Sequence, residues 1–405
     1  MREILLLSIS GQDYPGVTAA FTDVLSRHDV NILDIGQAVI HDALNLGMLL
    51  EIPSEDESGA VMKELLFLAH QKGLKVDFSP IAADDYETWV QAQGKPRYII
   101  TLLGRKLSAS NISHIAEVIS RFGLNISDIS RLSGRFSLDK ENDESRACVE
   151  FTTRGFTHNL EQFRQELLSI TQTDNVDVSF QVDNLYRRNR RLIVFDMDST
   201  LIQCEVMDEL AKAAGVGEQV AAITESAMQG EIPFDESFKR RLATLKGLDE
   251  SVLQDIAENL PITEGAERLI YNLKKMGYKV GILSGGFDYF ANYLKDKFDL
   301  DCVSANELDI VDGKLTGKVK GDIVNGEKKA ELLQKMANSL GIIMEQTIAV
   351  GDGANDLPML SIAGLGVAFH AKPIVKENAR HAISTLGLDS ILYLLGVRDR
   401  EVIDK

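Results

Sequence analysis

Three short polar segments in the second half of the chain each follow an apolar run that is typical of a buried strand. They span residues 196–200, 284–286 and 351–356, and they read DMDST, SGG and GDGAND. In an open sheet of parallel strands, ligands bind where the carboxyl ends of the strands meet. We therefore expect the three segments to form one site.

The side chains in these segments predict a phosphoryl-transfer site that uses a metal ion. Four carboxylates would be crowded together there, which is unfavourable unless a cation is present. Hard oxygen ligands of this kind suit Mg²⁺. Ser284 and the two glycines after it can offer a hydroxyl and backbone N–H groups to a phosphate. The four carboxylates are Asp196, Asp198, Asp352 and Asp356.

A cationic side chain for this site can come from Lys328 or Lys329, which open the helix expected before the third segment. Each signal has an ordinary structural explanation when taken singly, because Asp-x-Asp and Gly-Asp-Gly are common turns and paired lysines are common on solvated helix faces. Their order along the chain, each segment after an apolar strand, favours phosphoryl-transfer chemistry.

The elements that must position these residues form a parallel sheet. From Leu192 onward, apolar runs alternate with long helical stretches, which is the pattern of parallel strands joined by crossover helices. The runs that precede the three polar segments are Leu192–Phe195, Lys279–Leu283 and Thr347–Val350.

The first half of the chain contains an internal repeat. Residues 24–35 and 118–129 are similar, and each follows an apolar strand that ends in glycine, Ile4–Gly11 and Tyr98–Gly104. Each copy then continues as a βαββ pattern. Two copies of this kind predict two small α+β units, because a solenoid needs at least three repeats.

Two boundaries separate these parts. The polar stretch Ala82–Arg97 is typical of a linker. The second boundary, Asn184–Arg191, contains four arginines, which could bind nucleic acid or form a solvated hinge. Because the chain as a whole is acidic, we expect the solvated hinge.

Composition narrows the possible partners. The 405 residues carry a net charge of −18, so a nucleic acid or an anionic membrane is not expected as a partner. The three cysteines form no CxxC pair, which disfavours a zinc site or a disulfide framework and fits a reducing cytoplasm. No apolar stretch approaches the roughly 18–20 residues that cross a bilayer.

The polar segments resemble the motifs of the haloacid dehalogenase-like phosphatases, and within them those of the phosphoserine phosphatases, over about residues 186–405. The first half resembles tandem ACT domains, with Gly11–Thr18 similar to an ACT ligand loop; the second copy lacks the Pro-Gly pair there. The resemblance implies an α/β fold: a Rossmann-like parallel-sheet phosphatase core with a helical cap at about 204–261, preceded by two α+β (βαββαβ) ACT-like domains at 1–82 and 97–182.

The resemblance also implies roles. Asp196 is the nucleophile, and Asp198 protonates the leaving oxygen and then activates water. Mg²⁺ is held by Asp196, the backbone carbonyl of Asp198 and Asp352, with Asp356 orienting this set. Lys329 is preferred to Lys328 as the phosphate ligand. The implied substrate-binding residues are Glu205, Met228, Phe234, Arg241, Ser284, Gly285, Lys329 and Asn355.

The implied reaction is hydrolysis of O-phospho-L-serine to L-serine and phosphate, the last step of serine biosynthesis. Arg241 suits the substrate carboxylate because its planar fork can bind bidentately, while Arg240 beside it is expected to be solvated. Without the resemblance, Met228 and Phe234 would be assigned to ordinary packing. Two alternatives stay open: a phosphotransferase that uses an amino-acid hydroxyl, and a ligand-sensing regulatory protein.

A regulatory ligand is expected in the first ACT-like copy. The expected ligand is L-serine, and the candidate residues are Asp13, Gly16 and Asn31. The alternative is that the Pro-Gly pair only starts the following helix. Because ACT units commonly pair, the resemblance also implies a homodimer or a higher homo-oligomer.

Overall fold

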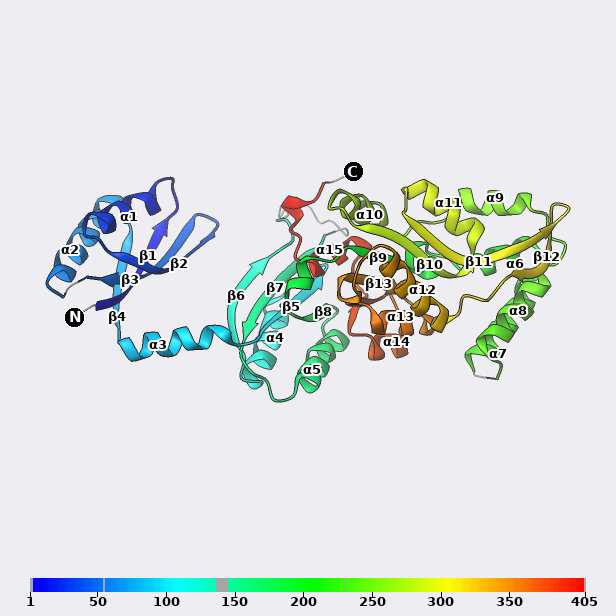
Figure 1. Cartoon of the computed structure of the whole chain (residues 1–405), viewed down its shortest axis with the longest axis horizontal. Helices are drawn as coiled ribbons and strands as arrows, with labels where there is room; N and C mark the ends of the chain where they lie inside the picture. Colours follow the sequence, from blue (N-terminus) through cyan, green and yellow to red (C-terminus); the bar gives the residue numbers. More distant parts are fainter. Residues whose placement is uncertain (1–2, 54, 136–144, 230, 404–405) are drawn as a thin grey trace. The chain divides into compact units, whose positions relative to one another are not determined.

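The computed structural model describes residues 3–53, 55–135, 145–229 and 231–403 (Figure 1). The chain divides into two compact units, Met1–Lys95 and Pro96–Lys405. Within the described ranges, every helix is too short or too polar to span a bilayer.

The first unit is an antiparallel four-stranded sheet in the order β2-β3-β1-β4, with helices α1 and α2 packed together on it. Alternate residues of β1, namely Leu5, Leu7 and Ile9, enter the core because successive side chains of a strand point to opposite faces. The stretch expected as a linker contains a further helix, α3. The elements are β1 (Glu3–Gln12), α1 (Val17–Arg27), β2 (Asn31–Ile40), β3 (Ala43–Ile52), α2 (Glu55–Lys72), β4 (Lys75–Ile81), α3 (Ala83–Gln91) and η1 (Ala92–Gly94).

The second unit begins with a sheet that repeats the first one. Its strand order is β6-β7-β5-β8. Each strand therefore has the same position in this sheet as its counterpart has in the first sheet. Both sheets have a register shift at the same place, between Ile32 and Asp34 in β2 and between Ile126 and Asp128 in β6. The elements are β5 (Arg97–Gly104), α4 (Ala109–Arg121), β6 (Asn125–Arg131), β7 (Ala147–Arg154), α5 (Leu160–Thr173), β8 (Asp177–Val182) and η2 (Leu185–Arg188).

The rest of the second unit is built on a seven-stranded sheet in the order β12-β11-β10-β9-β13-β14-β15. The pairs from β11 to β15 are parallel, as the sequence predicts, and β12 is antiparallel at the edge. The strands are β9 (Leu192–Phe195), β10 (Lys279–Phe287), β11 (Cys302–Val311), β12 (Lys314–Lys320), β13 (Thr347–Gly351), β14 (Leu365–Phe369) and β15 (His381–Ile383).

Helices cover both faces of this sheet, which is why its central strands are continuous apolar runs. In β9, Ile193 and Phe195 join the core beneath α10 and α11, whereas Leu192 and Val194 join the core beneath α12, α13 and α14. The helices of the core are α10 (Ala266–Lys275), α11 (Asp288–Phe298), α12 (Gly326–Ser339), α13 (Leu357–Ile362), α14 (Pro373–Asn378) and α15 (Ile391–Leu394).

A helical insertion follows the short turn η3 (Met197–Leu201), which directly succeeds β9. An antiparallel bridge between Ile202 and Ile262 closes its neck, where the Gln203 N–H donates to the Pro261 carbonyl at 2.8 Å. The insertion therefore leaves and re-enters the core at one point. Its helices are α6 (Val206–Ala213), α7 (Gly217–Met228), α8 (Phe234–Thr244) and α9 (Ser251–Glu258).

Buried polar contacts join the second sheet to the core built on the seven-stranded sheet. One carboxylate oxygen of Asp177 accepts from the N–H groups of Ser384 and Thr385 at 2.9 and 2.8 Å and from the Thr385 hydroxyl at 2.6 Å. The expectation of a solvated hinge at 184–191 is wrong for two of its arginines. Arg187, which pairs with a glutamate of β7, is 1% exposed, and Arg190 is 8% exposed. Packing between the second sheet and the core buries them, and this is a tertiary effect that the local sequence does not show.

Replacing Asp177 with Ala should lower the free energy of unfolding by about 2–4 kcal/mol, because two backbone N–H groups lose a charged acceptor in a buried place. Urea unfolding of the full chain measures this loss. Asp183→Ala is the control, since the Asp183 side chain makes no hydrogen bond or ion pair within the described residues. Equal stability of the two variants would contradict the assignment of Asp177 as the anchor of the junction.

Candidate active site

The strand register brings the three polar segments to one edge of the sheet. Phe195 of β9 pairs with Ile282 of β10 on one side and with Val350 of β13 on the other. The backbone N–H of Asp196 donates to the Val350 carbonyl at 2.8 Å, so this residue continues the strand pairing by one step. Segments 196–200, 284–286 and 351–356 therefore begin at nearly the same level, as the sequence predicts.

A buried lysine lies between two of the carboxylates. Lys329, in the first turn of α12, is 0% exposed, and its Nζ lies 2.9 Å from Asp196 Oδ2 and 2.7 Å from Asp356 Oδ1. Burial by itself would lower the pKa of this ammonium, but the two carboxylates outweigh burial and raise it. Lys329 therefore stays charged. Lys328 turns outward and pairs with Glu331 at 3.0 Å.

The orientation of Asp196 is fixed at both carboxylate oxygens. Oδ1 accepts from the Met197 backbone N–H at 2.7 Å, and Oδ2 faces the Lys329 ammonium. Asp356 is fixed in the same way, since its Oδ2 accepts from the Gly353 N–H at 3.0 Å. Position 351 must be glycine, because a Cβ there would lie 2.4 Å from the Asp356 carboxylate.

Asp196, Asp352 and Asp356 form a group that could hold a metal ion, with one oxygen of each within 4.8 Å of the others. Asp352 also accepts from the Thr200 hydroxyl at 3.2 Å. Burial, with the nearby charges of Asp196 and Glu205, raises the pKa of Asp352 to about 7. Carboxylates held this close repel one another unless a cation neutralises them. The donor set therefore fits a hard divalent cation.

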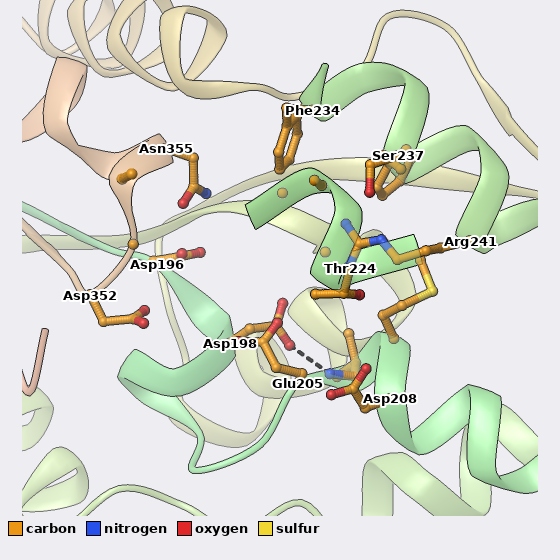
Figure 2. Close-up of a pocket in the computed structure, with 18 of the residues that line it drawn as sticks. Asp196, Asp198, Glu205, Asp208, Thr224, Phe234, Ser237, Arg241, Asp352 and Asn355 are labelled. Carbon is orange, nitrogen blue, oxygen red and sulfur yellow. Dashed lines mark hydrogen bonds between the residues drawn. The ribbon is translucent and has the colours of Figure 1, made fainter. Parts of the chain in front are cut away.

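Asp198 lies across the site from the lysine. Its Oδ1 accepts from the Val206 N–H at 2.8 Å at the start of α6 (dashed line in Figure 2). Burial, together with Glu205 and Asp196, raises the pKa of Asp198 well above its usual range. A Cβ on Gly286 would lie 2.4 Å from Asp198 Oδ2, so only glycine fits at position 286 beside this carboxylate. The surroundings of Asp198 therefore favour its protonated form more than water does.

The Ser-Gly-Gly segment forms the third side of the site. Ser284 is fully buried, and its Oγ accepts from the Gly286 N–H at 2.8 Å. The Asn306 side chain donates to the carbonyls of Gly285 and Gly286 at 2.8 and 3.2 Å, and these bonds hold the loop in place. Gly285 and Gly286 line the pocket, and the buried Ser284 and Lys329 are not among the residues that line it.

The strand ends and the insertion enclose a pocket of about 520 Å³. Glu205 and Arg241 line the insertion side (Figure 2). Glu205 accepts from the Ser199 hydroxyl at 2.7 Å, and its pKa is raised by burial and by Asp196. Burial lowers the pKa of Arg241, and Glu205 opposes this effect. An anion and a cation therefore face the same space.

Phe234 and Asn355 also line the pocket. Phe234 is 39% exposed and stacks on Phe238, with ring centroids 6.5 Å apart. Met228 ends helix α7, but its side chain lies outside the described part of the structure.

The sequence reasoning missed several polar residues that line the pocket, among them Asp208, Thr224 and Ser237. Ser237 is 1% exposed, and its hydroxyl has no hydrogen-bond partner within the described residues. It lies one turn before Arg241 on α8, and both side chains reach the pocket (Figure 2). The i, i+4 spacing could have indicated Ser237, because residues four apart share a helix face.

The residues expected to bind a regulatory ligand lie in the first unit and do not meet. The Asp13 N–H donates to the Asp42 carbonyl, at one end of β3, whereas Asn31 pairs with Glu51 near the other end. The stretch from 42 to 51 spans about 30 Å at about 3.3 Å per residue. One small ligand cannot contact both side chains within a single chain. Gly16 precedes α1 with φ of 92°, which favours glycine.

Comparisons with known proteins agree with this architecture. The ACT domain family matches residues 3–79, and the haloacid dehalogenase-like hydrolase family matches residues 190–364. The phosphoserine phosphatase of Mycobacterium tuberculosis is 40% identical over 98% of this chain and 94% of its own length. The phosphoserine phosphatase of Streptomyces coelicolor is 39% identical over 98% of this chain and 93% of its own length.

A solved structure of an unliganded probable phosphoserine phosphatase from Vibrio cholerae is also similar. It has a TM-score of 0.58 and 36% identity, and the match covers 74% of this chain and 86% of that one. Its similarity supports the fold of the parallel-sheet core, and the whole-chain matches decide the family. The chain is a haloacid dehalogenase-like hydrolase with an N-terminal ACT domain, and it belongs to the phosphoserine phosphatase family.

Proposed function

We propose that the protein hydrolyses O-phospho-L-serine to L-serine and phosphate through an aspartyl-phosphate at Asp196, as the last step of serine biosynthesis. The observation that carries this proposal is the buried Lys329 between Asp196 and Asp356, beside a pocket that offers one anion and one cation. The related proteins are named as phosphatases, which supports hydrolysis over transfer to an amino-acid hydroxyl and over a purely ligand-sensing role.

Asp196 is the nucleophile. An ionised carboxylate attacks phosphorus without losing a proton first, and the covalent intermediate divides one difficult step into two easier ones. The Lys329 ammonium, 2.9 Å from Asp196 Oδ2, offsets the negative charge of this buried carboxylate. Lys329 and Ser284 hold the phosphoryl oxygens as charge moves among them, and Asn355 and the Gly285 backbone complete this cradle.

A Mg²⁺ ion would be held by Asp196, Asp352 and the backbone carbonyl of Asp198, with Asp356 orienting the set from its contact with Lys329. When bound, the ion offsets the negative charge of the carboxylates and of the incoming phosphate. The close approach of the Asp196, Asp352 and Asp356 oxygens supports this assignment.

Asp198 is the acid and then the base. The leaving serine oxygen needs a proton, and the raised pKa of Asp198 supplies a protonated carboxyl group on the side facing the pocket. After the transfer, the same group is a carboxylate that takes a proton from the attacking water. The Val206 N–H holds one of its oxygens in place through both steps.

Phosphoserine is recognised by opposite charges. Arg241 would bind the substrate carboxylate with its planar guanidinium, and Glu205 would bind the ammonium. The Ser237 hydroxyl, which is buried at the pocket and has no partner among the described residues, would supply a further hydrogen bond. Phe234 and Met228 are assigned to the lid that excludes water from the bound substrate.

We also propose that the first half of the chain regulates this activity. We divide the chain into ACT-like domains at 1–82 and 97–182 and a phosphatase domain at 186–405 with a cap at about 204–261. The matching strand orders and register shifts of the two small sheets support this division. L-serine binds at the loop with Asp13 and Gly16, and Asn31 joins the site only if a second chain supplies it, as in a homodimer.

The three free cysteines support a cytoplasmic location.

Replacing Asp196 with Asn should abolish both turnover and the covalent intermediate, because an amide is not a competent nucleophile at phosphorus. The measurement is acid quench of the protein with radiolabelled phosphoserine, followed by counting of protein-bound phosphate. Asp255→Asn, an exposed change on helix α9, is the control and should label normally. Normal labelling of the Asp196 variant would show that the nucleophile is another residue.

Replacing Arg241 with Ala should raise KM for phosphoserine by about 30-fold or more, since a desolvated charged contact is worth about 2–4 kcal/mol. KM for phosphoethanolamine, which lacks the carboxylate, should change much less. Arg240→Ala removes the same charge from an exposed pair with Glu236 and should leave both values unchanged. An equal rise for both substrates in the Arg241 variant would mean that this residue is structural.

Replacing Gly16 with Val should weaken L-serine inhibition of the full-length protein by about tenfold or more, because valine is strained at positive φ and the loop must shift. Inhibition is measured at fixed phosphoserine concentration. Gly123→Val is the control, since this glycine also has positive φ in an open turn, but in the second copy. Unchanged inhibition in the Gly16 variant would assign any serine effect to product binding in the pocket.

A further inference from the structure

A buried arginine at the junction between the second sheet and the core has no anionic partner among the described residues. Arg190 is 8% exposed, and no carboxylate of the described residues lies within ion-pair distance of it. Its Nη2 donates to Gln181 Oε1 at 3.2 Å and its Nη1 donates to the Glu345 carbonyl at 3.3 Å, whereas its Nε has no partner. A buried cation that is held only by neutral acceptors is costly.

Arg190 lines a cleft of about 950 Å³ that is separate from the catalytic pocket. One wall comes from α5 and β8 of the second sheet, and the other from η4 (Met344–Gln346), α13 and β15 of the core. Two further arginines line the cleft, Arg164 on α5 and Arg380 just before β15. Two acidic residues line it as well: Glu161, whose carboxylate pairs with Arg164 at 2.8 Å, and the exposed Glu345, so the three arginines outnumber the carboxylates.

The pKa of a histidine at the base of the cleft is affected by the charges of the arginines around it. His381 is buried, and its Nδ1 lies 2.9 Å from the Ser179 hydroxyl. Burial, followed by the charges of Arg190, Arg164 and Arg380, lowers the pKa of His381 to about 3. In a chain with a net charge of −18, this cleft is therefore a local region of positive potential.

Glycine at position 364 leaves room for the Arg190 guanidinium. A Cβ at Gly364 would lie 2.8 Å from Arg190 Nη1 and 2.3 Å from the Glu345 carbonyl. Glycine at 364 thus lets the end of α13 approach the charged group closely. Phe180 and Ile362 add apolar surface to the lining, so the cleft offers both a cationic base and an apolar wall.

We propose that this cleft binds a small organic oxyanion, with its carboxylate or phosphate group held by Arg190, Arg164 and Arg380. The cleft volume falls within the range of about 300–1,000 Å³ that is common for small-molecule sites. Because the two walls belong to the second sheet and to the core, the ligand bridges the junction. The anion supplies the counter-charge that Arg190 lacks within the described residues.

The test is a calorimetric titration of the full-length protein with sulfate and, separately, with malonate. The test variant is R164M/R380M, which removes two charges of the cleft and leaves the buried Arg190 in place. The control is R188M/R191M, which removes two exposed charges of the neighbouring segment that do not line the cleft. Phosphoserine turnover should be the same in all three proteins, since none of these residues lines the catalytic pocket.

Sulfate can also occupy the phosphoryl site, and all three proteins share that site. The proposal predicts a second site in the wild type and the control, weakened by about tenfold or more in the test variant. Weakening of the sulfate site alone identifies a tetrahedral oxyanion as the preferred ligand, and weakening of the malonate site alone identifies a carboxylate. Identical isotherms for the test variant and the control with both probes would overturn the proposal and leave Arg190 as a structural tether.

Discussion

The contact on which the site depends is the one between the buried ammonium of Lys329 and the carboxylates of Asp196 and Asp356. Without this cation, the ends of β9 and β13 would bring uncompensated negative charges together in a buried place, which is costly. Breaking a buried pair of this kind typically costs about 3–5 kcal/mol. The ammonium offsets the charge of Asp196, the proposed nucleophile, and holds its Oδ2, while the Met197 N–H holds Oδ1.

The rest of the architecture brings other groups to this contact. The parallel register aligns three strand ends, and the glycines at 286 and 351 let the chain pass carboxylates at distances that no side chain would tolerate. The cap adds a separate pair of charges, Glu205 and Arg241, on the far side of the pocket. In the proposal, the sheet supplies the chemistry and the insertion the selectivity. The two are coupled at Asp198, which accepts from the Val206 N–H of the insertion and whose pKa Glu205 helps to raise.

Sequence reasoning located the strand ends because short apolar runs followed by polar residues are a local signal. It could not choose between Lys328 and Lys329 from the residues alone, since that depends on the rotation of α12 about its axis. It missed Ser237 because this residue looks like any other helix residue in the sequence, and only the packing of the cap against the sheet brings it to the pocket. It also expected Arg190 in solvent, because burial at a junction between domains is decided by packing that no local pattern encodes.

The central claim is that phosphate leaves substrate in two displacements, first to Asp196 and then to water. The stereochemical course at phosphorus tests it directly, with phosphoserine made chiral by oxygen isotopes and sulfur and with isotopic water as the second nucleophile. Each in-line displacement inverts the configuration. Two displacements therefore predict net retention in the released thiophosphate, and net inversion would contradict the account by showing a single direct attack by water.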